Sequence, residues 1–158
     1  MIDELAVFDD FPGVADAGAA SHSHWLDTLA RADDQAMKAM AEDLLPLLGE
    51  VEVVQSRTGL VMLPLRDTVA GTDFHLGEVL VAEAHIRLPG TAIEGYGMVT
   101  GRDLERAMAM AVIDAAAMAG TEADRISRFI DAEADRMRAV DDERLRAVEA
   151  TRVDMETF

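Results

Sequence analysis

Hydrophobic positions in residues 104–119 recur every three or four residues, which gives a helix one apolar face. Gly95 and Gly97 lie in the apolar segment before it, and Gly101 marks a sharp exit from that segment. The pattern predicts a strand over 93–99, a tight turn and a long helix, around which the rest of the chain is organised. The apolar face of this helix comprises Leu104, Ala107, Met108, Ala111, Val112, Ala115, Met118 and Ala119.

Three more strands are predicted upstream. Residues 51–55 are rich in β-branched side chains and residues 60–65 are apolar, so Thr58 and Gly59 are expected to turn between two strands of a hairpin. Residues 74–88 alternate as a long third strand. Because the consecutive connections are short, the sheet is expected to be antiparallel rather than built from βαβ units.

Helical patterns occur on both sides of this region. A first helix is expected to start after Ser21 or Ser23, and a second after Asp33, with Gly49 closing it. Residues 122–150 carry a thin apolar stripe among many charges and predict a last helix or helix pair. The fold class is therefore α+β: an antiparallel sheet of about four strands packed against a long helix, with flanking helices at both ends.

The chain has 158 residues, and one domain is expected. Residues 1–20 are acidic and then small, and are expected to form a flexible acidic N-terminal arm. Residues 21–158 would form a single α+β domain.

Charge and composition exclude several functions. The net charge of −17 argues against non-specific binding to nucleic acid or to anionic membranes, which needs clustered Lys and Arg. The chain has no cysteine, so it cannot form disulfides, a thiolate nucleophile or iron–sulfur ligation. Neither a signal peptide nor an apolar run of about 18 residues is present, so a cytoplasmic protein is expected.

The glycines before the long helix are spaced as Gly95-x-Gly97-x-x-x-Gly101. This spacing differs from that of the dinucleotide-binding fingerprint, and the strands before it look antiparallel. We therefore attribute the three glycines to a turn and to close packing.

Candidate chemistry is sparse. His22 and His24 are two apart, but no recognised zinc spacing accompanies them, so no metal site is predicted. No catalytic triad, P-loop or HExxH motif occurs, and no catalytic residue is assigned. Gly101 and Arg102 stand where a helix opens, and free N–H groups beside an Arg could contact a phosphate. Alternatively, Arg102 pairs with Asp103 and ties the turn.

Five short segments within residues 21–158 are informative when they are taken together and in order. They are His24-Trp25 with Leu29-Ala30; Thr58-Gly59-Leu60-Val61; Phe74, Leu76-Gly77-Glu78 and Arg87-Leu88; Gly95-Tyr96, Gly101-Arg102-Asp103 and Ile113-Asp114-Ala115; and Ala150-Thr151-Arg152-Val153-Asp154. Taken in this order, they resemble the PhnG family, which supplies one of the subunits of the phosphonate carbon–phosphorus lyase system.

The resemblance implies membership of a multi-subunit complex with subunits H, I and J, acting with subunit L in organophosphonate breakdown. In the first committed step, an alkylphosphonate displaces adenine from MgATP. The nucleosidase-like chemistry is attributed to subunit I, and the iron–sulfur cluster and S-adenosylmethionine belong to another subunit. The PhnG protein is then an assembly partner that binds no cofactor, and whether it has enzymatic groups of its own is left open.

The chain departs from the family pattern at several positions. The family tends to have an acid where this chain has Arg57, and an Arg in the third strand where it has Glu83. An aromatic often near position 98 is Met98, and a paired aromatic is replaced by Met155 and Glu156.

Exposed aromatic and apolar side chains are the expected partner surface, because such anchors often dominate interfaces. The candidates are Trp25, Tyr96, Met98, Val153, Met155 and Phe158. One alternative is a direct contribution to catalysis, in which Arg102 holds a phosphonate or triphosphate oxygen. Another is a non-catalytic homo-oligomeric domain that binds a small ligand or a protein unrelated to phosphonates, since self-association of the isolated chain is possible.

Overall fold

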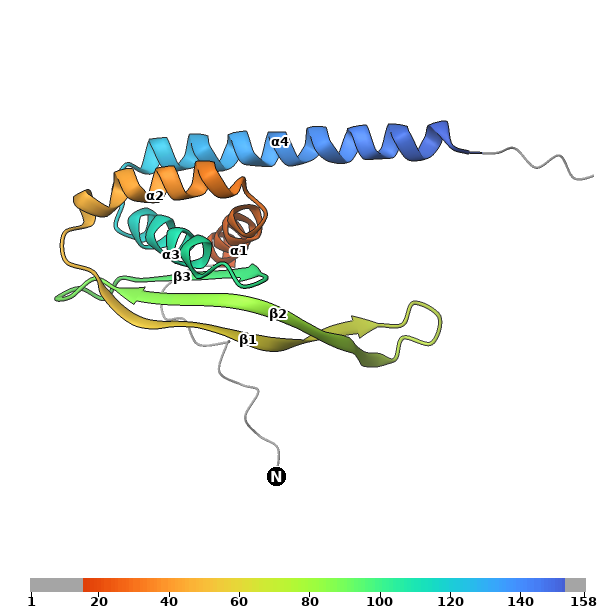
Figure 1. The fold of residues 1–158 in the computed structure, drawn as a ribbon, viewed down its shortest axis with the longest axis horizontal. Coiled ribbons are helices and arrows are strands. Elements are labelled where there is room, and N and C mark those ends of the chain that lie inside the picture. The colour runs from red at the N-terminus through yellow and green to blue at the C-terminus, as the bar shows by residue number, and fades with distance from the viewer. Residues whose placement is uncertain (1–15, 153–158) are drawn as a thin grey trace, which may run out of the picture.

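The computed structural model of the protein describes residues 16–152, and the arm predicted over residues 1–20 lies mostly outside them. Within this part, helices flank an antiparallel sheet on both sides in the sequence (Figure 1). The elements are α1 (Asp16–Ala30), α2 (Asp34–Leu48), β1 (Glu52–Arg66), β2 (Asp73–Arg87), β3 (Glu94–Thr100), α3 (Leu104–Met118) and α4 (Ala123–Ala150). The predicted α+β class is confirmed.

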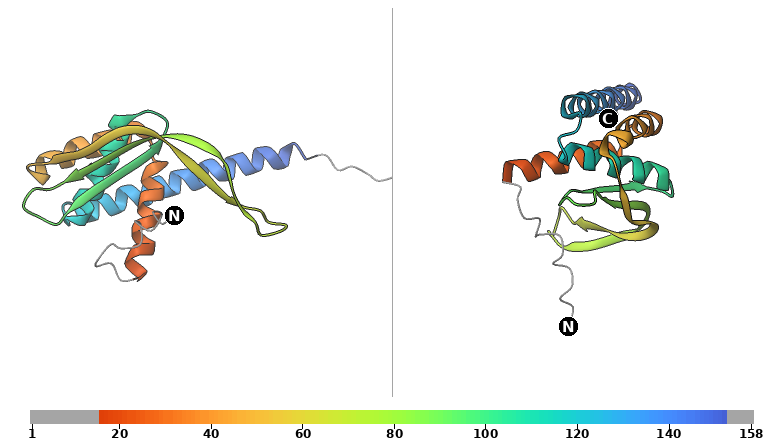
Figure 2. Two further views of the ribbon diagram at one scale, coloured as in Figure 1. Left: turned by 90° about the horizontal axis from the view of Figure 1, so that it is seen from below. Right: turned by 90° about the vertical axis from the view of Figure 1, so that its left-hand side faces the viewer.

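The elements form three layers (Figures 1 and 2). The sheet is one outer layer, α3 and α1 cover one of its faces, and α2 and α4 lie on the far side of those two helices. Helix α3 contacts both β2 and β3, and α2 packs on α3. The hydrophobic core therefore lies between the sheet and the helices and reaches up to α2 and α4.

Helix α3 lies almost on the backbone of β3. A methyl group placed on Gly95 would lie 2.2 Å from the carbonyl oxygen of Ala111, and one on Gly97 would lie 2.0 Å from that of Ala107. Ala107, Ala111 and Ala115 are completely buried. Glycine on the strand and alanine on the helix are needed because any larger pair would separate the two elements.

The sheet has the order β1-β2-β3 and is antiparallel throughout. The predicted hairpin turn at Thr58 and Gly59 is wrong: both lie within β1, paired with Ala82 and Val81. Two predicted strands are therefore one strand of 15 residues, which is why the sheet has three strands.

The turn between β1 and β2 lies at residues 67–72 instead. The Asp67 carboxylate accepts hydrogen bonds from the backbone N–H groups of Val69 and Ala70. Gly71 has a φ of 68°, a left-handed conformation that glycine adopts without strain. This side-chain-to-backbone pattern is typical of tight turns, and Thr58-Gly59 has no counterpart to it.

The terminal helices differ in extent from the prediction. Helix α1 begins at Asp16 rather than after Ser21 or Ser23, because the alanine-rich residues before them continue the helix. Residues 123–150 form one helix rather than a pair. Asp33 caps α2 as predicted, accepting hydrogen bonds from the N–H groups of residues 35 and 36. In the described part of the chain, no helix combines the length and apolar character needed to span a bilayer.

Candidate functional site

The β1–β2 hairpin extends far beyond the helices that cover the rest of the sheet (Figure 1). Strand β3 pairs only with Val81–Arg87 of β2, so residues 60–80, here called the distal hairpin, are a two-stranded ribbon. Large apolar side chains are exposed throughout it: Leu60, Met62, Leu63, Leu65, Val69, Phe74 and Leu76.

These apolar side chains lie on both faces of the distal hairpin. Side chains alternate along a strand, so Leu60 and Met62 share one face and Leu63 lies on the other. Leu60 is 62% exposed. A two-stranded hairpin is at best marginally stable in water, and contiguous exposed apolar surface marks interaction sites. The distal hairpin is therefore suited to binding another protein.

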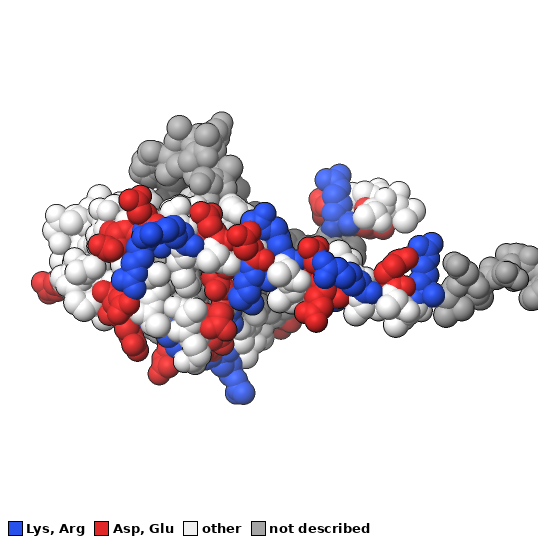
Figure 3. All heavy atoms as spheres, turned by 90° about the horizontal axis from the view of Figure 1, so that it is seen from above, with Lys and Arg blue, Asp and Glu red and all other residues white. Residues whose placement is uncertain are grey.

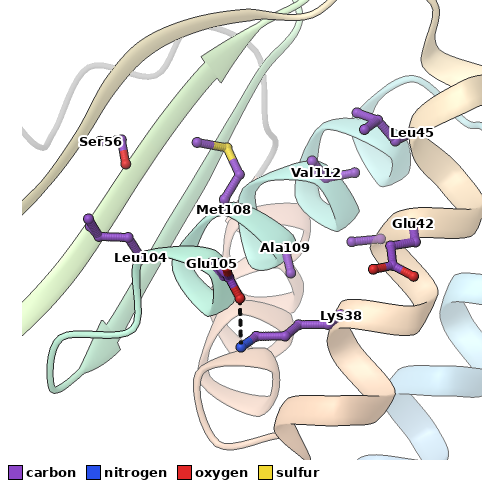
Figure 4. Close-up of a pocket in the computed structure, with 10 residues that line it drawn as sticks. Lys38, Glu42, Leu45, Ser56, Leu104, Glu105, Met108, Ala109 and Val112 are labelled. Carbon is purple, nitrogen blue, oxygen red and sulfur yellow. Dashed lines mark hydrogen bonds and ion pairs between the residues drawn. The ribbon is translucent and has the colours of Figure 1, made fainter.

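A groove lies beside the base of the distal hairpin (Figure 4). Its volume is about 490 Å³, and it runs between α2, α3 and β1, with Ser56 on the strand side. The remaining lining is mainly apolar: Ala41, Leu45, Leu104, Met108, Ala109 and Val112, with Lys38, Glu42 and Glu105. Figure 4 shows Leu104 and Met108 on the side of the helix toward β1, and Leu45 and Glu42 on α2 opposite.

The cation in this groove is already paired. Lys38 Nζ lies 2.9 Å from Asp103 Oδ2 and 3.4 Å from Glu105 Oε2. The backbone N–H of Arg106, and then the Lys38 ammonium, hold the pKa of the Asp103 carboxyl below its usual value. The N-terminus of α3 thus carries its own capping carboxylate, neutralised by Lys38.

Helix α4 forms a second projection. Its first turns are anchored by buried Ile126 and Ile130 and by Glu133, whose carboxylate accepts hydrogen bonds from the Asp33 N–H at 2.9 Å and from Arg136 Nε at 2.8 Å. The outer half leaves the body, with Val140, Leu145 and Val148 exposed. Figure 3 shows acidic and basic side chains interspersed along the face that α4 covers, which is typical of a solvated helix.

A buried carboxylate joins three elements at the opposite corner of the sheet. Asp114 of α3 is only 3% exposed. Its Oδ1 lies 2.6 Å from His22 Nε2 of α1, and its Oδ2 accepts the backbone N–H of Tyr96 at 2.9 Å. Both oxygens are engaged in holding α1 and β3 against α3, so this acid has a structural role.

Tyr96 connects this corner to the outer face of the sheet. Its ring stacks on His85 with centroids 4.2 Å apart, and its hydroxyl donates to Glu94 at 2.7 Å. Burial, followed by the hydrogen bond to Glu94, raises the pKa of Tyr96 to about 12. The same hydrogen bond, followed by those from Arg87 and His85, lowers the pKa of the Glu94 carboxyl. The hydroxyl is therefore held neutral and is poorly suited to act as a base.

The three predicted interface residues that the structure describes have different surroundings. Trp25 is partly buried against the core, Tyr96 is in the network just described, and Met98 is 43% exposed on β3. Val153, Met155 and Phe158 lie outside the described residues. Partner contact at these six positions stays a prediction.

Gly101 and Arg102 lie at the α3 N-terminus as expected, with Arg102 exposed. In the described part of the chain, Asp103 forms its ion pair with Lys38 rather than with Arg102. Phosphate contact at Gly101 and Arg102 also stays a prediction. Among residues 16–152, no group of three or more His, Cys, Asp or Glu side chains is placed to hold a metal ion.

The distal hairpin was not predicted from the sequence as a binding surface. The sequence feature that could have indicated it is the run Leu60–Leu63, in which consecutive apolar residues put apolar side chains on both faces of a strand. A chain with helices on only one side of its sheet cannot cover both faces.

An ion pair joins β1 to β2 across the sheet. Arg57 on β1 is paired with Glu83 on β2, and Arg57 Nε lies 3.0 Å from Glu83 Oε2. This cross-strand ion pair ties β1 to β2 at the base of the distal hairpin.

The described residues define a small α+β protein with two projecting arms and an apolar groove, features that suit contact with another protein. The chain belongs to the phosphonate metabolism protein PhnG family, whose model matches residues 20–158. It is 33% identical over 144 residues to the alpha-D-ribose 1-methylphosphonate 5-triphosphate synthase subunit PhnG of Rhizobium meliloti (strain 1021), covering 90% of this chain and 91% of that protein. The resemblance noted from the five segments is confirmed.

Proposed function

We propose that this chain is an accessory, assembly-promoting subunit of the carbon–phosphorus lyase core complex in the cytoplasm. In that role it supports transfer of an alkylphosphonate onto the ribose C1 of MgATP, with release of adenine. Family membership supports the proposal, as does the name of the relative, a subunit of the corresponding synthase.

The observation that carries the assembly role is the distal hairpin. A two-stranded ribbon that exposes Leu60 and Leu76 is suited to contact with another protein. The proposed partners are subunits H, I and J, with L acting in the same step. MgATP is the substrate of the complex, and no cofactor is assigned to this chain.

Co-expression with tagged subunit I, with and without H and J, tests the proposal. We expect the chain to co-elute in stoichiometric amount in size-exclusion chromatography and phosphonate-dependent release of adenine to require it. If the folded chain elutes separately while the other subunits are soluble and associated, the assembly role is wrong. A stable homo-oligomer under those conditions would favour a stand-alone binding domain.

A further inference from the structure

We propose that another subunit of the same enzyme adds an extended segment to the free edge of β1. Its apolar side chains would occupy the groove and the inner face of the distal hairpin. The proposal rests on the proposed function, since it assigns the surface through which the subunit is held.

The free edge of β1 provides backbone groups for pairing. Strand β1 pairs with β2 on one side, and among the described residues no strand pairs with its other side. It is 15 residues long. Proteins shorten, charge or cover their edge strands because unpaired N–H and C=O groups recruit other strands. Pro64 and the register shift beside it interrupt the outer end of β1, but residues 55–63 run without a shift. That uninterrupted stretch of free edge is therefore suited to strand addition.

The groove and the distal hairpin form one continuous surface along this edge. Ser56 lines the groove, and the next alternate positions on β1, Thr58, Leu60 and Met62, share its face because the register does not shift between them. Leu104 of α3 also lines the groove (Figure 4). A strand beside β1 would thus place every second side chain against apolar surface over most of its length.

The charge of the chain indicates what kind of segment would pair with β1. The chain carries a net charge of −17, so a second copy would bring an equal negative charge to the same surface. Lys38 is already paired with Asp103 and Glu105, which leaves Glu42 as the exposed charge of the α2 side. The fitting partner is an extended apolar segment flanked by Arg or Lys.

Hydrogen exchange of the complete complex and of the free chain tests the placement. We expect the backbone amides of residues 52–66 to exchange at least about tenfold more slowly in the complex, with little change in residues 140–150. Leu45→Glu and Leu60→Glu should each lower recovery of the complex by about tenfold or more. Leu145→Glu is the matched control: the same change at a site 65% exposed on α4 should leave recovery unchanged. Unfolding curves of each free variant show that the fold is retained.

Several results would overturn the proposal. Protection at α4 with none at β1, or loss of the complex only with Leu145→Glu, would place the partner on α4 while the assembly role survives. If β1 is protected equally in the free chain and in the complex, the chain covers its own edge. A dimeric mass of the free chain in light scattering would then identify a second copy as the occupant. Absence of any complex would remove the assembly role itself.

Discussion

Gly97 on β3 and Ala107 on α3 approach so closely that a methyl group on Gly97 would sit 2.0 Å from the Ala107 carbonyl oxygen. Gly97→Ala should therefore destabilise the fold by about 3 kcal/mol or more, the upper range for overpacking, because backbone must move to admit it. Chemical denaturation measures the loss. Gly77→Ala is the matched control, since a methyl group there meets nothing within 4 Å. Equal effects of the two substitutions would contradict this close packing.

Asp114 should be needed for stability rather than for chemistry. Asp114→Ala leaves the Tyr96 N–H and the His22 ring without their acceptor, at a cost of about 1–3 kcal/mol. Asp114→Asn should cost less, because an amide oxygen can still accept from the Tyr96 N–H. Thermal unfolding ranks the two variants. Wild-type stability with lost turnover in the assembled complex would instead make Asp114 a catalytic group.

Alkaline titration should find the tyrosine resistant to ionisation. The chain contains one tyrosine, so tyrosinate absorbance reports Tyr96 alone. Its pKa is raised from 10.0 to about 12 in the folded chain. This contribution to stability is fully present below pH 10 and is lost as pH rises through the folded pKa.

The midpoint should therefore lie near 12 in the folded chain and near 10 in denaturant. Glu94→Gln should lower the folded midpoint only part of the way, because burial remains the larger cause. Identical midpoints in the folded and unfolded chains would show that the hydroxyl is solvated.

The ion pair between Arg57 and Glu83 can be tested by reversing one charge and then both. Arg57→Glu places a carboxylate opposite Glu83 and should destabilise by up to about 1 kcal/mol, the range for exposed pairs. Adding Glu83→Arg to the same chain should restore most of the loss. Denaturation of the single and double variants gives the coupling energy. A double variant as unstable as the sum of the singles would mean that the two side chains do not interact.

Arg102 is the remaining predicted contact with phosphate. If it holds a phosphonate or triphosphate oxygen, Arg102→Ala lowers turnover in the assembled complex while the subunits still co-purify. Arg144→Ala, at an exposed position on α4, controls for loss of a positive charge. Unchanged turnover with Arg102→Ala would restrict the subunit to assembly.

The elements with strict periodicity were predictable from the sequence. Helix α3 and the alternating apolar face of β2 lie where expected. The single apolar face predicted for α3 was too narrow: Ala109, Met110 and Ile113 are buried as well, because α2 and α4 cover the side of α3 that faces away from the sheet. Gly95 and Gly97 were correctly attributed to close packing. The family, and with it the functional class, followed from ordered motifs rather than from any single site.

The predictions that were wrong or missing concern contacts between residues far apart in the sequence, which no local sequence pattern indicates. Gly59 looked like a turn residue, yet it pairs with Val81 and stays in an extended strand. In the sequence, Asp114 is a single acidic residue within an apolar helix. Its partner His22 is 92 positions away, so the contact could not be predicted from the local pattern. The groove forms only when α2 and β1 approach α3, so its lining could not be grouped beforehand.

Helix α4 is held to the body as far as Arg136, whose guanidinium donates to the Arg31 carbonyl at 3.1 Å, and in the described part of the chain every residue of the helix after Met137 is exposed. At 1.5 Å per residue, the part from Met137 to Ala150 is about 20 Å long. A tilt of about 10° at the anchored turns therefore displaces the end of the helix by about 3 Å. Small repacking around Ile126 and Ile130 is thereby magnified at the outer end of the helix, far from where it occurs.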